Sequence, residues 1–286
     1  MKIAVIGSTG QLGQDLIRTW GGEAVGFAHG DLDVTDGVGV ASAMHSLRPD
    51  WVINTAAYHR VDDCEVNPAL AFAVNTLGAQ NVARAASLVG AGVVFVSTDY
   101  VFGAQDRGRD HPYEEGDDPC PLNVYGVSKA AGERLVVQDN ERHIVVRTAG
   151  LYGTATSRKG WTFPELMLEK ARTEGSVSVV TDQVLSPTFT ADLADKTREL
   201  VERDAKGVFH LTNAGECSWF EFARGTFELA GVEAEMKPIE TGQTGRRARR
   251  PSYSALATSR LAGVGLGPMR PWNEALADYL RAKGLG

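Results

Sequence analysis

The chain opens with a short apolar run, KIAVIG, and a glycine-rich turn follows it at once. Gly7, Gly10 and Gly13 stand at regular spacing in GSTGQLG, and a helical pattern continues to about residue 20. An apolar strand that turns through glycine into a helix is typical of the first unit of a parallel α/β sheet. This feature constrains the fold most, because parallel strands need crossover connections and further strand–helix units beside them.

Further units of this kind follow along the first half of the chain. Strand patterns lie at 24–29, 51–57, 92–102 and 143–152, and helical patterns lie at 10–20, 37–48, 68–89 and 122–138. This alternation predicts an α/β fold, a Rossmann-type doubly wound parallel sheet.

The pattern loosens after about residue 150. The stretches 153–164 and 181–190 are rich in Gly, Pro, Ser and Thr and are predicted to be loops, and helical patterns return at 162–173, 190–203, 218–230 and 271–283. We expect 1–150 to form a dinucleotide-binding domain and 151–286 to form mainly a smaller α/β substrate-binding region. The chain is expected to cross between the two, for example at 181–215.

Composition excludes several classes of protein. A net charge of -7 disfavours general nucleic-acid binding, and no apolar run approaches the roughly 20 residues that span a bilayer. The N-terminal run is too short for a signal peptide. Three scattered cysteines favour a reducing cytoplasm, and the six scattered histidines show no metal-ligand spacing, so we expect no metal site.

The glycine turn has a specific use at a helix N-terminus. Glycines let the backbone approach a pyrophosphate, and the free N–H groups of the first helical turn, at the positive end of the helix dipole, bind its oxygens. The spacing is GxxGxxG rather than GxGxxG, but it follows a strand and precedes a helix. The alternative is a tight turn that binds no ligand.

Residues after the second and third strands would contact the adenosine part of a dinucleotide. Asp33 could accept a hydrogen bond from the adenine amino group while the Val34 N–H reaches a ring nitrogen; alternatively Asp33 caps the helix at 37–48. Ala56 and Ala57 would allow a cofactor to lie close to the backbone. No carboxylate stands at the end of strand two, where His29 is found, and this favours NADPH over NADH.

Three polar side chains could form a catalytic set. Thr98 ends strand four, and Tyr125 and Lys129 lie one helical turn apart in NVYGVSKAAGERL. Alone, such a pair is typical of an ordinary surface helix. With the glycine turn and the strand-end hydroxyl it predicts a phenol whose pKa is lowered by a neighbouring ammonium.

These motifs together resemble those of the dTDP-4-dehydrorhamnose reductase family, within the extended short-chain dehydrogenase/reductase superfamily. The resemblance spans nearly the whole chain and rests on GSTGQLG, NTAAYHRVDDCE, AFAVNT, STDYVF, PLNVYGVSKAAGE, RTAGLYG, TDQVLSPTFTADLAD and RRPSYSAL. It implies that a nicotinamide cofactor reduces the C4 ketone of a dTDP-4-keto-6-deoxy sugar, a step of dTDP-rhamnose and polysaccharide biosynthesis.

The resemblance also implies roles for individual residues. Tyr125 would protonate the developing alkoxide, Lys129 would tune the phenol and hold the nicotinamide ribose, and Thr98 would orient the sugar. Asp99 would contact the substrate. The related dehydratases carry Asp-Glu after the threonine, whereas here Asp99 is followed by Tyr100, which favours simple reduction. Tyr100 would contact the ligand or, alternatively, pack beneath a loop.

The candidate residues fall into three groups. For catalysis they are Thr98, Tyr125 and Lys129; for the cofactor, NADPH or NADH, they are Gly7, Thr9, Gly10, Gln11, Leu12, Gly13, Asp33, Val34, Ala56, Ala57, Tyr58, Tyr125 and Lys129; for the substrate they are Thr98, Asp99, Tyr100, Gln183 and Arg250.

Some alternatives stay open at this point. The arginine-rich stretch 241–254 is a phosphate contact or a solvated loop. The protein could instead be a reductase or epimerase of another nucleotide sugar, or a non-catalytic dinucleotide-binding regulatory subunit. The expected partner is a small-molecule nucleotide sugar, with neither nucleic acid nor membrane, and the sequence leaves a homodimer open.

Overall fold

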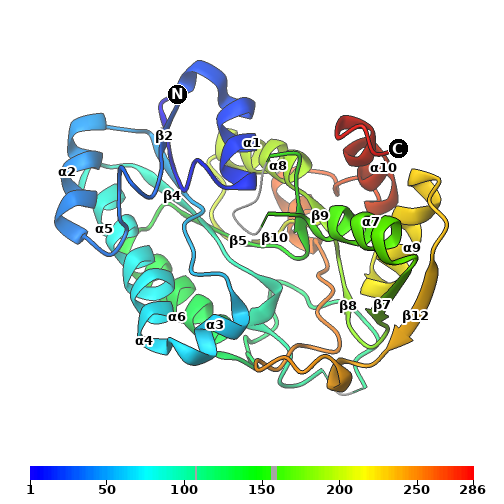
Figure 1. Ribbon diagram of the computed structural model, residues 1–286. Helices are drawn as coiled ribbons and strands as arrows, with labels where there is room; N and C mark the ends of the chain where they lie inside the picture. The colour runs from blue at the N-terminus through cyan, green and yellow to red at the C-terminus, as the bar shows by residue number, and fades with distance from the viewer. Residues whose placement is uncertain (107, 156–159) are drawn as a thin grey trace.

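A six-stranded parallel sheet forms the centre of the computed structural model, which describes residues 1–106, 108–155 and 160–286 (Figure 1). The strands run in the order β10 (Gly207–His210), β5 (His143–Arg147), β4 (Gly92–Val96), β3 (Trp51–Asn54), β1 (Ile3–Ile6) and β2 (Ala24–Phe27). The chain runs outward from β1 to β2 and then returns to β3 on the other side of β1. The predicted doubly wound sheet is thus confirmed, with its switch point between β1 and β3.

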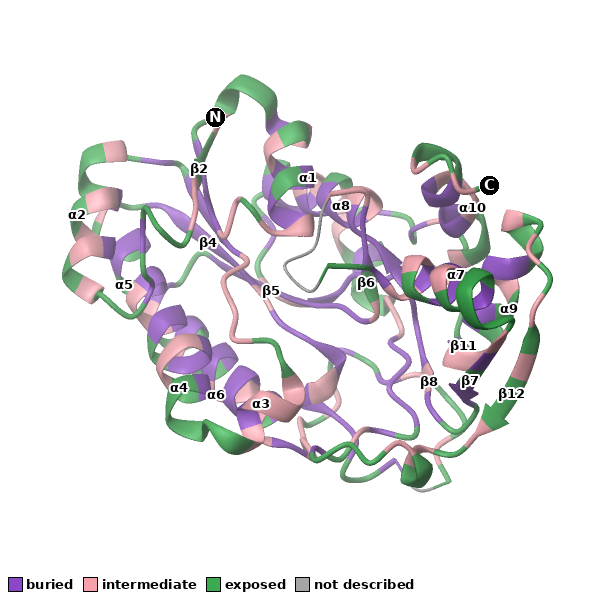
Figure 2. Ribbon diagram, in the orientation of Figure 1, coloured by how far each residue is buried: buried purple, intermediate pink, exposed green. Residues whose placement is uncertain are grey.

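Helices cover both faces of this sheet. One face carries α1 (Gln11–Trp20) and α8 (Thr190–Glu202), and the other carries α2 (Gly37–Leu47), α5 (Ala79–Leu88) and α6 (Val124–Asp139). Alternate residues of β1 serve the two cores: Ile3 and Val5 pack towards α1, and Ala4 and Ile6 pack towards α2 and α5. Figure 2 shows β4 and β5, in the middle of the sheet, as mostly buried.

The helical pattern at 68–89 is interrupted in the structure. It contains α4 (Pro68–Phe72), a π-helical turn η2 (Ala73–Gly78) and α5, and α3 (Val61–Val66) precedes it. Such π turns are frequent at functional sites because they re-aim side chains within a helix. Here the turn brings the Asn75 carbonyl so close to α6 that a Cβ on Gly132 would lie 2.3 Å from it.

A second region packs beside the sheet around its own aromatic core. Its helices are α7 (Phe163–Glu174), α9 (Trp219–Ala230) and α10 (Trp272–Ala282), and its parallel strands are β7 (Ser176–Val180) and β12 (Glu235–Ile239). Short strand pairs join β6 (Leu151–Tyr152) to β9 (Thr188–Phe189) and β8 (Val184–Leu185) to β11 (Cys217–Ser218). The short 3₁₀ helices are η1 (Gly21–Glu23), η3 (Asp99–Val101), η4 (Thr241–Gln243) and η5 (Ser259–Val264).

Two stretches after residue 150 were predicted to be loops. The stretch 181–190 was expected to lack regular structure, but β8 and β9 lie within it, because each pairs with a strand distant in sequence. Of the loop expected at 153–164, residues 156–159 lie outside the described residues. Within the described ranges, every helix is too short or too polar to cross a lipid bilayer.

Candidate active site

The glycine turn lies at the switch point of the sheet. Gly7 has φ +82°, and a Cβ there would stand 2.4 Å from Thr55 Oγ1 at the end of β3. Gly10 is the N-cap of α1 and provides no side-chain hydrogen bond, so the first N–H groups of this helix keep their capacity to bind an anion. The turn therefore fits the pyrophosphate of a dinucleotide.

Gly13 is the tightest position of this turn. A Cβ there would lie 2.2 Å from the Gly7 carbonyl oxygen and 2.8 Å from Ser8 Cα, both backbone atoms. We expect Gly13→Ala to open the turn, to lower the free energy of unfolding by about 1–3 kcal/mol, and to weaken dinucleotide binding measured by calorimetry. Gly22→Ala is the matched control, since nothing lies within 4 Å of its Cβ position. Unchanged binding in Gly13→Ala would show that the turn does not hold the cofactor.

Asp33 and Asp36, which follow β2, have different roles in the structure. Asp36, not Asp33, caps α2, because its side chain accepts a hydrogen bond of 3.0 Å from Gly39 N. Asp33 is exposed and accepts from the N–H and hydroxyl of Thr35. The capping role considered for Asp33 is therefore wrong, and its carboxylate stays at the surface where an adenine could meet it.

The loop after β3 is held by a residue that sequence reasoning missed. Asn75, fully buried in η2, accepts a hydrogen bond of 2.8 Å from Tyr58 N and donates to Tyr58 O and to Ser128 Oγ. It thus joins the loop that carries Ala57 to the turn of α6 that carries Lys129. Asn75 lies in the motif AFAVNT, but the motif alone does not show that its side chain connects this loop to α6.

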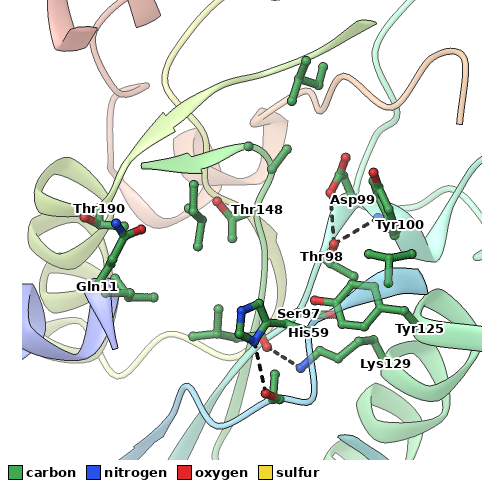
Figure 3. Close-up of a pocket in the computed structure, with 18 of the residues that line it drawn as sticks. Gln11, His59, Ser97, Thr98, Asp99, Tyr100, Tyr125, Lys129, Thr148 and Thr190 are labelled. Atoms are coloured by element: carbon green, nitrogen blue, oxygen red, sulfur yellow. Dashed lines mark hydrogen bonds between the residues drawn. The ribbon is translucent and has the colours of Figure 1, made fainter. Parts of the chain in front are cut away.

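The Thr98, Tyr125 and Lys129 side chains gather at one edge of the sheet (Figure 3). Thr98 follows β4 and caps η3, accepting a hydrogen bond of 3.2 Å from Tyr100 N. Asn123 caps α6 through Gly126 N at 2.8 Å. A Cβ on Gly126 would lie 2.1 Å from the Tyr100 carbonyl oxygen, so α6 approaches η3 closely and holds the Tyr125 ring beside Thr98.

The Tyr125 phenol differs from the prediction in the direction of its pKa. Burial raises this pKa above its ordinary value, and the nearby Asp99 carboxylate raises it further, while a hydrogen bond with Thr98 acts in the opposite direction. The expected lowering is therefore wrong for the chain alone, because desolvation outweighs the neighbouring groups. The phenol keeps its proton at neutral pH, as a proton donor must.

Lys129 lies fully inside the protein. Its Nζ donates a hydrogen bond of 2.7 Å to Val96 O and stands 3.8 Å from the centre of the Phe95 ring. Burial lowers the pKa of this amine to about 7, and Glu133 acts in the opposite direction. The amine therefore titrates near neutrality and responds to any charge placed beside it.

The glycine turn and the Thr98, Tyr125 and Lys129 side chains border one cavity of about 470 Å³. The predicted residues that line it are Gly7, Gly10, Gln11, Leu12, Gly13, Ala57, Thr98, Asp99, Tyr100, Tyr125, Lys129 and Gln183. The predicted residues outside its lining are Thr9, Asp33, Val34, Ala56, Tyr58 and Arg250. The cavity is also lined by residues that sequence reasoning did not assign, including His59, Thr148, Thr190, Trp219 and Ser254.

Thr148 is informative among the missed residues. Its hydroxyl is buried, and no hydrogen-bond partner is found for it in the described part of the chain. A buried hydroxyl without a partner is costly to fold, so its place on the wall of this cavity indicates a ligand that completes it.

Arg250 binds within the protein rather than on the cavity wall. Its guanidinium pairs with Asp62 on α3 at 2.8 Å, and this contact lowers the pKa of the Asp62 carboxyl to about 2. The Ala248 N–H and the Arg249 carbonyl bind Asp62 and Asn123, respectively. The segment 246–250 is thus anchored to α3 and α6, and Pro251, which follows it, lines the cavity.

Comparison with known proteins supplies independent evidence. A family model described as the RmlD substrate binding domain matches residues 1–284. The chain is 40% identical to a dTDP-4-dehydrorhamnose reductase of Mycolicibacterium smegmatis, over 98% of this chain and 85% of that protein. It is 36% identical to a dTDP-4-keto-6-deoxy-D-glucose reductase of Streptomyces niveus, over 96% of this chain and 94% of that protein.

A solved structure agrees with these relatives. The dTDP-4-dehydrorhamnose reductase of Bacillus anthracis, in complex with NADP, superimposes with a TM-score of 0.92 at 37% identity and covers 98% of this chain and 99% of that one.

Proposed function

The chain belongs to the dTDP-4-dehydrorhamnose reductase family, whose RmlD-type model matches residues 1–284, and from this premise we propose that it reduces the C4 ketone of a dTDP-4-keto-6-deoxy sugar. It is an NAD(P)H-dependent nucleotide-sugar 4-ketoreductase. We place its task in the biosynthesis of dTDP-rhamnose or a related polysaccharide sugar. The three cysteines are free thiols, which fits action in a reducing cytoplasm.

One observation carries this proposal. A single cavity contains the glycine turn and uncapped α1 N-terminus at one side and the hydroxyls of Thr98 and Tyr125 at the other. A dinucleotide that places its pyrophosphate on the turn extends along the sheet edge towards these hydroxyls. A non-catalytic binding subunit has no need of a buried proton donor there.

The residues of the chain divide the work of reduction. When bound, the nicotinamide supplies the hydride. Tyr125 holds a proton at its phenol oxygen and gives it to the ketone oxygen as charge develops there. Thr98 fixes the position of that oxygen by hydrogen bonding. Asn75 holds α6 in place through Ser128, and Gly126 allows α6 to pack closely against η3. The Lys129 ammonium stabilises the phenolate that remains.

NADPH is the favoured cofactor. Strand β2 ends at Phe27, followed by Ala28 and His29, and the next carboxylate along the chain, Asp31, accepts a hydrogen bond of 2.9 Å from the Ala28 N–H. A 2′-phosphate thus meets a histidine rather than a carboxylate aimed at the ribose.

The sugar would lie between the catalytic edge and the second region. Gln183, held by Thr241 at 2.7 Å, and the aromatic rings of Trp161 and Trp219 border the cavity there. Apolar rings suit the 6-deoxy face of such a sugar, and the amide suits its hydroxyls.

The test is oxidation of NADPH or NADH, followed by the loss of its near-ultraviolet absorbance, with a panel of dTDP-4-keto-6-deoxy sugars and with UDP- and GDP-sugars as comparison. We expect turnover with dTDP-4-keto sugars and a higher kcat/KM with NADPH. Turnover confined to UDP- or GDP-sugars would contradict the proposed substrate, and cofactor binding without any turnover would contradict enzymatic function.

A further inference from the structure

Asp99 is a buried carboxylate held between two hydroxyls from distant parts of the chain. Its Oδ2 accepts a hydrogen bond of 2.6 Å from Ser254 Oγ, and its Oδ1 accepts one of 3.0 Å from Thr98 Oγ1. Asp99 is 4% exposed and Ser254 is also 4% exposed, and both border the cavity. These contacts place Asp99 directly behind the hydroxyl that is to meet the substrate.

The protons of these groups can be counted. Thr98 has one hydroxyl proton, and while Asp99 is ionised this proton is donated to the carboxylate. The Thr98 oxygen meanwhile accepts from Tyr100 N, and the Tyr125 phenol is also hydrogen-bonded to Thr98. In this state Thr98 has no proton for a ketone oxygen, and Asp99 places a negative charge beside the atom that becomes an alkoxide. Both effects oppose reduction.

Burial, and not a neighbouring charge, favours the neutral form of Asp99. Tyr125 faces it from α6 and Tyr100 lies in η3 itself, while the Arg246 and Arg250 charges act on the Tyr100 phenol. Lys129, also on α6, donates its hydrogen bond to Val96 O. Burial raises the pKa of Asp99 to about 6, and the hydrogen bonds from Ser254 and Thr98 act in the opposite direction.

We infer that Asp99 is a positioning residue that is protonated in the reactive enzyme: its carboxyl proton is donated to Thr98 Oγ1, and Thr98 then donates its own proton to the ketone oxygen. Ser254 orients the carboxyl group for this task. The inference rests on the proposed reduction and deepens it. Asp99 takes part in no bond breakage. The Tyr125 O–H bond breaks, an O–H bond forms at the former ketone oxygen, and the protons of Asp99 and Thr98 move only within hydrogen bonds.

The first test is the pH profile of kcat. In the wild-type enzyme we expect kcat to fall as pH rises through the Asp99 pKa of about 6, because the neutral form is lost, and to fall again near pH 7, where the Lys129 amine loses its proton. Asp99→Asn imitates the neutral form, since its amide donates to Thr98 and accepts from Ser254, so this variant should stay within about tenfold of the wild-type maximum, lose the decline near pH 6 and keep the one near pH 7. In Ser254→Ala the decline should move to higher pH, because the ionised carboxylate loses a donor.

Two controls make the profile decisive. Ser252→Ala removes a hydroxyl from the same segment, one that donates to Asp106 instead, and should leave the profile in place. Asp99→Leu has neither donor nor acceptor and should fall well below Asp99→Asn. A loss of about 100-fold or more in Asp99→Asn at every pH would mean that the charge is required. A decline near pH 6 that persists unchanged in Asp99→Asn would likewise overturn the inference.

The second test does not depend on turnover. The folded pKa of Asp99, about 6, lies above its ordinary value of 3.8, so between these values the folded state holds a proton that the unfolded state releases. The free energy of unfolding of the wild type, minus that of Asp99→Asn, should therefore fall as pH rises through this window and level off above it. If this difference in the free energy of unfolding did not change with pH, Asp99 would not be protonated in the folded enzyme and the inference would be wrong. If no dTDP-sugar is turned over while this titration is observed, the proposed substrate fails and the state of Asp99 stands.

Discussion

Replacing Tyr125 by phenylalanine should reduce kcat by about 10²–10⁴-fold, the range that a general acid contributes. The phenol keeps its proton because burial raises its pKa, so it can release that proton only to a stronger base. The alkoxide formed at C4 is such a base. Phenylalanine retains the ring, which contacts Tyr100 edge-on with centroids 6.1 Å apart, but has no proton to give.

The measurement is single-turnover oxidation of NADPH with the preferred dTDP-4-keto sugar, alongside cofactor binding by calorimetry. Tyr113→Phe is the matched control, because this tyrosine is also buried and its hydroxyl has no partner in the described residues, yet it lies outside the cavity. We expect the control to keep its activity and both variants to bind NADPH. A Tyr125→Phe enzyme within tenfold of wild type would require another proton donor.

Replacing Lys129 by methionine should have opposite effects on activity and stability. The amine is buried and its pKa is lowered to about 7 from 10.5. The folded state therefore binds the proton less tightly than the unfolded state does, and holding the ammonium inside the protein costs about 1.4 kcal/mol per pKa unit. Methionine fills a similar volume without this charge.

The sign of the pH dependence follows from linkage. Below pH 7 the wild type holds a buried ammonium, so Lys129→Met should be more stable there by a few kcal/mol. Between pH 7 and 10.5 the folded lysine is neutral while the unfolded lysine is still charged, so the stability of the wild type rises with pH and the advantage of the variant shrinks.

Activity should change in the other direction. Without the ammonium, the phenolate left on Tyr125 is not stabilised and the cofactor loses a contact, so we expect kcat to fall by about 100-fold or more and NADPH affinity to fall with it. Urea unfolding at several pH values and steady-state kinetics measure the two effects, with the exposed Lys206→Met as control. A variant that is both less stable below pH 7 and fully active would contradict the role given to Lys129.

Much of the site could be read from local patterns. The helical spacing of Tyr125 and Lys129 and the strand-end position of Thr98 predicted that the three would meet, and the structure brings them to one cavity. Thr148 and Ser254 also lie in the motifs RTAGLYG and RRPSYSAL, but the sequence alone does not show which groups their hydroxyls contact. Arg250 was expected at the substrate, and its ion pair with Asp62 could not be foreseen, because 188 residues separate the partners.

The sequence by itself determined the parallel sheet, the glycine turn at its switch point and the edge at which the site forms, because strand and helix periodicity and the conformational freedom of glycine are properties of short segments. Only the tertiary structure decided the protonation of the site. The raised pKa of Tyr125, the lowered pKa of Lys129 and the contact of Ser254 with Asp99 across 155 residues all depend on which distant segments exclude water from a group. Desolvation is a property of the packed molecule, and no local pattern records it.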